Sequence, residues 1–101
     1  MEIHTLRQAD RSILRLKGRF DFSCHKAFRE AYAPLLDQHD RQIDLHLADV
    51  EYLDSAALGM LLLLQERAEK IGARVTLVGA RGVVADILQV AHFERFFDIV
   101  G

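Results

Sequence analysis

Hydrophobic and polar residues alternate with a period of two in several stretches of the chain, and this period predicts β-strands. In residues 12–17, for example, Leu14 and Leu16 alternate with Arg15 and Lys17, which indicates one buried and one wet strand face. We expect Gly18 to break this strand. The predicted strands, the last of them a short strand or tail, are residues 2–6, 12–17, 43–48, 74–79 and 96–100.

Apolar residues recur at helical spacing in three segments between these strands. Ser23 is a plausible N-cap for the first helix, and Pro34 should kink or shorten it. The residues that form its buried stripe are Ala27, Phe28, Ala31, Tyr32, Leu35 and Leu36. The second helix is expected from Ser55 to about Ile71, with Gly72 as its C-terminal cap. The third spans residues 82–91, and its inward residues are expected to be Val83, Ile87, Leu88 and Ala91.

The resulting order, β-β-α-β-α-β-α-β, predicts an α/β fold with a mixed sheet whose core is parallel. The chain of 101 residues has the commonest size of one domain and contains no repeat or linker, so residues 1–101 are interpreted as a single domain.

The predicted second helix is more hydrophobic than a helix on one sheet face requires, because no residue from Ala56 to Leu64 is polar. A stripe that would suffice for the core consists of Leu58, Leu61, Leu62 and Gln65. The residues that fall on the opposite side are Ala56, Gly59, Met60, Leu63 and Arg67. Either neighbouring helices or an oligomer bury this second stripe, or it is a surface on which a partner protein docks.

Composition narrows the function classes. Half of the residues are hydrophobic and 28% are charged, which is typical of a globular protein and argues against disorder. The net charge of −2 provides no field for direct binding of nucleic acid. The single cysteine, Cys24, cannot form an internal disulfide, and neither a signal peptide nor a membrane segment is apparent, so a cytoplasmic protein without a membrane partner is expected.

Catalytic and metal-binding motifs are not evident. The five histidines are not spaced like the ligands of a metal ion, and Cys24 has no second cysteine with which to form a Cys-x-x-Cys redox motif. No glycine-rich phosphate loop or acid–base dyad is present. We therefore expect neither an enzyme nor a resident cofactor or metal.

The corner Asp54-Ser55 lies where a predicted strand meets the second helix. A serine at a helix start is a common N-cap, and Asp54 can cap as well. The same hydroxyl, exposed at a helix N-terminus, can also be a site of reversible modification. Spacing alone leaves both interpretations open.

The segment Leu53-Asp54-Ser55-Ala56-Ala57-Leu58-Gly59 resembles the signature of STAS domains, and more narrowly that of bacterial anti-sigma factor antagonists. Three other segments are similar to elements of that family. Residues 18–21 resemble its Gly-x-Leu-Asp element, residues 72–79 its Gly-Gly-x-Leu-x-Leu strand, and residues 84–88 with Phe93 its last helix. The resemblance covers essentially the whole chain and implies a mixed sheet of four or five strands with three or more helices.

In that family, the residue that matches Ser55 is phosphorylated by a serine kinase that is also the anti-sigma factor, and a serine phosphatase reverses the reaction. The resemblance implies that unmodified protein captures the anti-sigma factor and that modified protein releases it. Here Ala56 and Ala57 stand where the family commonly has Ser or Thr and then Gly, so Ser55 is the only candidate acceptor at the corner. Asp21 and Asp54 are expected to orient this site. The residues expected to bind the partner are Asp21, Asp54, Ala56, Gly59, Met60 and Leu63.

Three hypotheses follow. The first is a phospho-regulated anti-sigma factor antagonist. The second is a non-switching STAS subunit of a transporter or another complex, in which the same helix face is permanently buried. The third is a small-molecule or nucleotide sensor, for which the sequence locates no pocket. A homodimer through the apolar helix face is compatible with each of them.

Overall fold

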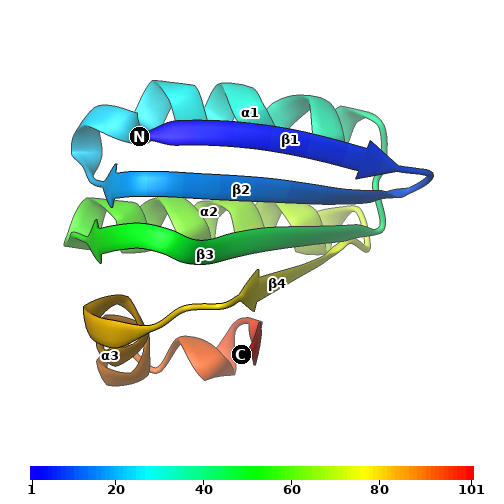
Figure 1. Cartoon of the computed structure of the whole chain (residues 1–101). Helices are drawn as coiled ribbons and strands as arrows, with labels where there is room; N and C mark the ends of the chain where they lie inside the picture. The colour runs from blue at the N-terminus through cyan, green and yellow to red at the C-terminus, as the bar shows by residue number, and fades with distance from the viewer.

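The computed structural model describes residues 1–101, which form one five-stranded sheet in the order β1-β2-β3-β4-β5. The strands are β1 (Glu2–Gln8), β2 (Arg11–Phe20), β3 (Gln42–Leu53), β4 (Arg74–Val78) and β5 (Asp98–Val100). β1 pairs with β2 in antiparallel orientation, and the other pairs are parallel (Figure 1). The predicted α/β fold with a mixed sheet and a parallel core is therefore confirmed.

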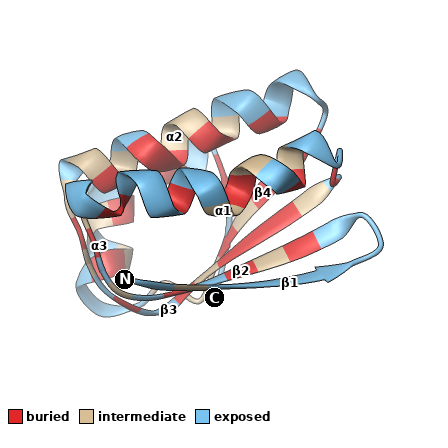
Figure 2. Cartoon of the chain, turned by 90° about the horizontal axis from the view of Figure 1, so that it is seen from above, coloured by how far each residue is buried: buried red, intermediate tan, exposed pale blue.

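The longer helices are α1 (His25–Asp37), α2 (Ser55–Lys70) and α3 (Gly82–Val90), and two single 3₁₀ turns are η1 (Phe22–Cys24) and η2 (Phe93–Arg95). α1 and α2 lie side by side over one face of the sheet (Figure 2). Leu14 and Leu16 of β2 point into the core beneath them, whereas Arg15 and Lys17 are exposed on the other face. The alternation in β2 thus has the predicted orientation.

β2 does not end at Gly18, contrary to the prediction. The strand continues to Phe20, and its register with β3 shifts between Gly18 and Arg19. Gly18 has φ +105°, a conformation that glycine adopts without a steric penalty. A bulge at this position therefore replaces the expected break.

The cap expected for the first helix is wrong, and of the two effects expected of Pro34 the shortening does not occur. α1 begins at His25, after η1, and the side chain that caps η1 is that of Asp21 rather than Ser23. Pro34 does not shorten α1, which runs on to Asp37. Only three residues of the helix follow Pro34, so the proline disturbs little more than its final turn.

The C-terminal cap of α2 is confirmed. Gly72 has φ +75°, its N–H donates to the carbonyl of Glu69 (3.1 Å), and the N–H of Ala73 donates to that of Ala68 (2.9 Å). These two bonds form a Schellman motif, which requires a left-handed residue directly after the helix.

The inward faces of α2 and α3 differ from the predicted ones. The buried residues of α2 are Ala57, Met60, Leu61, Leu64 and Ala68, whereas Leu58, Leu62 and Gln65 are only half-buried. α2 packs against α1 as well as against β3 and β4, and its buried stripe faces the space between them. In α3 the buried residues are Val84 and Leu88, whereas Val83 is exposed and Ile87 and Ala91 are half-buried.

Candidate functional site at the start of α2

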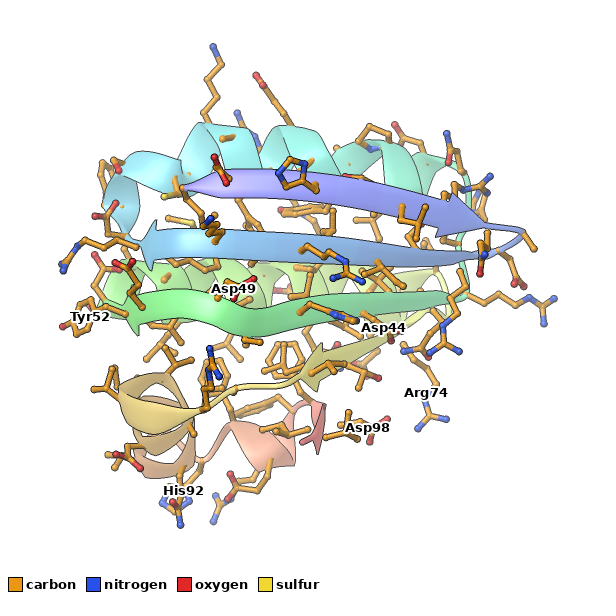
Figure 3. The ribbon with its side chains drawn as sticks, viewed as in Figure 1. Asp44, Asp49, Tyr52, Arg74, His92 and Asp98 are labelled. Atoms are coloured by element: carbon orange, nitrogen blue, oxygen red, sulfur yellow. The ribbon has the colours of Figure 1, made fainter.

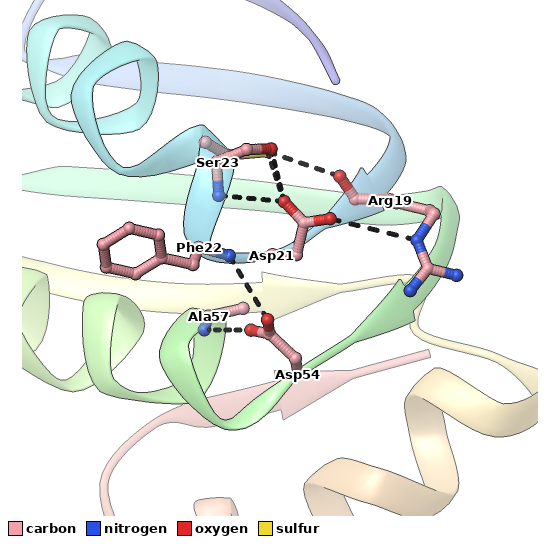
Figure 4. A network of polar contacts seen from close by, with 7 residues as sticks. Arg19, Asp21, Phe22, Ser23, Asp54 and Ala57 are labelled. Atoms are coloured by element: carbon pink, nitrogen blue, oxygen red, sulfur yellow. Dashed lines mark hydrogen bonds and ion pairs between the residues drawn. The ribbon is translucent and has the colours of Figure 1, made fainter.

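The parallel pairing of β2 and β3 brings the two predicted aspartates to the same edge of the sheet. Phe20 and Leu53 are register partners at the carboxyl ends of these strands. The next residues along the chain are Asp21 and Asp54. Because both strands end at the same level, η1 and α2 begin beside each other (Figure 4).

Asp54 is the N-cap of α2 and also joins this helix to η1. Its Oδ1 accepts the N–H of Ala57 (2.8 Å), and its Oδ2 accepts the N–H of Phe22 (3.2 Å) (Figure 4). One carboxylate therefore satisfies a free amide at the start of α2 and holds η1 against it.

Asp21 organises η1. Its Oδ1 accepts hydrogen bonds from the N–H of Ser23 (3.0 Å) and from the Ser23 hydroxyl, and its Oδ2 lies 3.9 Å from Nε of Arg19. The hydrogen bond from the Ser23 hydroxyl, together with the backbone N–H and Arg19, lowers the pKa of Asp21 below its ordinary value. Asp21 is therefore a fixed negative charge beside the start of α2 at neutral pH.

Ser55 is the first residue of α2 and is exposed. The cap comes from Asp54, so the fold does not require the Ser55 hydroxyl for that role. Of the four amides that a helix start leaves without an intrahelical partner, that of Asp54 donates to the carbonyl of Phe20 (3.3 Å) and that of Ala57 to Asp54. The amides of Ser55 and Ala56 remain beside the exposed hydroxyl.

A shallow groove of about 250 Å³ lies next to Ser55, between α2 and the segment that joins η1 to α1. The residues that line it are Phe22, His25, Ala56, Gly59, Met60 and Leu63. All four apolar residues that were expected on the partner-binding side of the helix thus lie in one groove. Met60 is only 7% exposed, so it forms the floor of the groove rather than its rim.

Sequence reasoning missed the two residues that η1 and α1 contribute to this groove. Phe22 is 73% exposed, and its ring stacks on that of His25 with centroids 6.4 Å apart. The available signal was an aromatic residue between Asp21 and Ser23, outside any helical or strand period. A large aromatic ring left in solvent beside a groove is a candidate anchor for a partner.

A second apolar groove of about 300 Å³ lies between α2 and α3. The residues that line it are Leu58, Asp86, Ile87, Val90 and Ala91. Leu58 is less than one helical turn from Ser55, and Val90 is 80% exposed. Ser55 therefore has an apolar groove on each side.

The surroundings of Ser55 are acidic. Asp21 and Asp54 flank the start of α2, whereas the exposed Asp49 lies further back along β3, five residues before Asp54 (Figure 3). The nearby cation, Arg19, is 3.9 Å from Asp21 and lies over the ring of Tyr52 at 4.8 Å. A new negative charge at Ser55 would therefore meet the like charges of Asp54 and Asp21.

None of the helices in the structure is long and apolar enough to cross a membrane.

Comparison with known proteins gives a family match along nearly the whole chain. Residues 3–101 match the family model described as "Mlab, STAS domain". A STAS-domain containing protein of Pseudomonas aeruginosa strain UCBPP-PA14 is 40% identical over 101 residues, which cover 98% of this chain and 99% of that protein.

Solved structures share the fold at lower identity. An anti-sigma factor antagonist from Mycobacterium paratuberculosis matches with a TM-score of 0.86 and 19% identity, covering 98% of this chain and 84% of that one. The anti-sigma factor antagonist SpoIIAA in its unphosphorylated form matches with a TM-score of 0.76 and 16% identity, covering 99% of this chain and 87% of that one. The Bacillus cell fate determinant SpoIIAA in its phosphorylated form matches with a TM-score of 0.76 and 15% identity, covering 99% of this chain and 92% of that one. A sulfate transporter family protein from Wolinella succinogenes matches with a TM-score of 0.80 and 18% identity, covering 94% of this chain and 80% of that one.

Proposed function

The chain belongs to the STAS domain family, and we propose that it acts in that family as a phospho-regulated binding module, an anti-sigma factor antagonist. The unmodified form binds an anti-sigma factor that is also a serine kinase, and thereby frees a sigma factor. Phosphorylation of Ser55 switches this binding off, and a serine phosphatase restores it. The observation that carries the proposal is the exposed Ser55, relieved of capping by Asp54 and placed beside an apolar groove.

The fold is suited to carry a phosphate at Ser55. A phosphoryl group adds about −1.5 to −2 charges at neutral pH. It would lie at the N-terminus of α2, near the amides of Ser55 and Ala56, where the helix dipole stabilises an anion. We therefore expect the modified protein to remain folded, so that the modification acts at the surface.

The same charge opposes docking of a partner. The groove that contains Ala56 and Gly59 begins directly after Ser55, so a partner seated there would cover the phosphate. Burying a charge without a compensating cation costs several kcal/mol, on the order of 3–5. Each 1.4 kcal/mol is about tenfold in affinity. Asp21 and Asp54 add repulsion and supply no compensation, so phosphorylation weakens binding by orders of magnitude.

The relatives are consistent with this proposal. SpoIIAA exists in an unphosphorylated and a phosphorylated form, and the Mycobacterium paratuberculosis protein is an anti-sigma factor antagonist. Their identity to this chain is low, so they support the shared fold, whereas the switch is inferred from the surroundings of Ser55.

The test combines mass spectrometry with two substitutions. A fraction of the protein isolated from its native cell should carry phosphate on Ser55, and the anti-sigma factor captured by the unmodified fraction should then be purified for binding measurements. We expect Ser55→Ala to bind that factor like the unmodified protein and Ser55→Asp to lose binding by about a hundredfold, or roughly 2.7 kcal/mol. Equal binding by the two variants would refute the switch.

A non-switching subunit of a transporter is the second candidate. It is favoured by the likeness to the sulfate transporter family protein and by the family description, which names Mlab beside the STAS domain. In that case the protein would co-purify in fixed stoichiometry with a transporter or its ATPase, Ser55 would carry no phosphate, and the groove beside it would be permanently covered.

A further inference from the structure

The groove that begins beside Ser55 leads along α2 toward an exposed cation. Its lining on α2 ends at Leu63, and Arg67 follows four residues later on the same side of the helix. The side chain of Arg67 reaches across to α1, where its Nη1 donates to the hydroxyl of Tyr32 (3.2 Å). The guanidinium of Arg67 therefore lies over the seam between α1 and α2, which run side by side (Figure 2).

α1 contributes a second arginine to this end of the groove. Arg29 follows His25, a lining residue of the groove, by four residues and so lies on the same side of α1 one turn further on. Arg29 and Arg67, which we call the arginine pair, are both exposed, and neither forms an ion pair. The one lysine of each helix, in contrast, is paired with a glutamate four residues away. The arginine pair is thus a free positive charge at the end of an apolar groove.

The two ends of the groove differ in how far their charges are already satisfied. At the Ser55 end, both oxygens of Asp54 accept backbone amides, and Asp21 has hydrogen bonds and a guanidinium of its own. At the other end, the guanidinium of Arg67 bonds to a neutral hydroxyl. An element that docks in the groove therefore finds its charge complement at the arginine pair, and that complement is a carboxylate.

The shape and length of the groove favour a helix. Arg67 follows Ser55 by twelve residues, or about 18 Å along the axis of α2. The seam between two packed helices accepts the side-chain ridge of a third, which is a recurrent mode of recognition. Carboxylates stabilise a helix when they lie in its first turn, because the N-terminal end of the helix dipole is positive. A docked helix consequently places its first turn at the arginine pair and runs antiparallel to α2.

We propose that the groove receives one amphipathic helix of the partner, antiparallel to α2, with carboxylates of its first turn bound by Arg29 and Arg67. This inference rests on the proposed function, because the helix belongs to the protein whose binding Ser55 controls. Its last turn lies at Ser55, where a phosphate would face the negative end of the helix dipole. A cation in that turn would compensate the phosphate, so the proposed switch requires the turn to be uncharged.

The test uses a synthetic helix as its probe and does not depend on the anti-sigma factor. The probe is a peptide of about 16 residues, held helical by a hydrocarbon staple, with glutamates in its first turn and a leucine stripe along one face. Titrated into the isotope-labelled chain at low salt, it should bind with a Kd of about 0.1 mM and shift the NMR signals of Phe22, Gly59 and Arg67. The same peptide with glutamines in place of the glutamates should bind about tenfold more weakly.

Variants of the arginine pair locate the carboxylates. Arg29→Gln and Arg67→Gln should each weaken binding of the glutamate peptide about threefold, and the double variant should bind both peptides alike. Lys26→Gln and Lys70→Gln are matched controls on the same two helices and should leave binding unchanged. A spin label on the first residue of the peptide should broaden the signals around Arg67 and spare those around Ser55.

Three outcomes would overturn the proposal: neither peptide saturates, both peptides bind equally to the unmodified chain, or the spin label broadens the signals around Ser55. None of these outcomes touches the switch, because phosphate on Ser55 and its effect on the captured anti-sigma factor are measured separately. Conversely, if the glutamate peptide binds as expected and the protein from its native cell carries no phosphate, the switch fails and the groove assignment stands.

Discussion

Asp54 and Ser55 are adjacent in the sequence, yet they have different roles in the structure. The carboxylate of Asp54 accepts the amides of Ala57 and Phe22, so it holds α2 and η1 together. The Ser55 hydroxyl is exposed one residue further on. Because the cap and the candidate acceptor are separate residues, Ser55 can be modified without removing the cap.

This division of roles has a measurable consequence. Asp54→Ala removes the N-cap and the bond to Phe22, so we expect it to lower the free energy of unfolding by about 2 kcal/mol. Asp54→Asn keeps an acceptor for Ala57 and should cost about half as much. Ser55→Ala should stay within roughly 0.5 kcal/mol of the unmodified protein. Urea unfolding measures all three, and an equal loss in Asp54→Ala and Ser55→Ala would contradict the assignment.

For single residues, the sequence was informative where the signal depends only on neighbouring positions in the chain. The pattern around Asp54 predicted a helix start, and Gly72 predicted a left-handed cap, because both signals are local. Ser23 was mistaken for a helix cap because Ser and Asp compete for that role, and Asp21 caps a 3₁₀ turn that periodicity does not detect. The exposed ring of Phe22 depends on how η1 is held by a residue 32 positions away.

α2 illustrates what periodicity can and cannot determine for an element. Its existence and bounds were predicted, but of the residues predicted to face the core only Leu61 is buried. An unbroken apolar run from Ala56 to Leu64 has no polar side to fix the rotation of the helix. The buried stripe is set by contacts with α1, β3 and β4, which belong to the tertiary structure. Met60 consequently forms the floor of the groove, and Gly59 lies on its open side.

Replacing Gly59 by alanine should raise the stability of the fold and weaken the binding of a partner. It lies inside α2, and a Cβ added there would meet no atom within 4 Å, so Gly59→Ala should raise the free energy of unfolding by about 0.5–1 kcal/mol. The same methyl group would stand in the groove beside Ser55 and weaken a docked partner. Thermal unfolding should show a rise of several degrees, about 4–8 °C per kcal/mol for a domain of this size.

Gly72→Ala is the matched control for this effect. The same atoms are added to an equally open position, but φ of +75° penalises a side chain there by about 1–2 kcal/mol. This variant should be less stable and should bind the partner normally. If Gly59→Ala were stabilised and bound with unchanged affinity, the groove would not be the docking site.

For the whole molecule, the parallel pairing of β2 and β3 determines where function is concentrated. The order of elements predicted a parallel core but not which strands pair, and it is the observed pairing that brings Asp21 and Asp54 to a common edge. The sequence could not show that α1 and α2 share one face of the sheet, or that α3 turns Val83 and Val90 toward solvent. These features depend on how the layers pack, and they place an apolar groove on each side of Ser55.

A partner could dock in either of the two grooves, and single substitutions can show which one it occupies. Phe22 is 73% exposed on the α1 side and Val90 is 80% exposed on the α3 side, so truncating either should change the free energy of unfolding by no more than about 0.5 kcal/mol. All four apolar residues expected to bind the partner lie on the Phe22 side, and a stacked aromatic ring is the stronger anchor.

We therefore expect Phe22→Ala to weaken binding of the captured anti-sigma factor by about 2 kcal/mol, or roughly thirtyfold, with Val90→Ala within about threefold of the unmodified protein. Calorimetry with both variants distinguishes the sides. The opposite ranking would move the interface to the groove between α2 and α3. Because Leu58 in that groove is also less than one turn from Ser55, a phosphate would still oppose docking there, and the proposed switch would survive with a different surface.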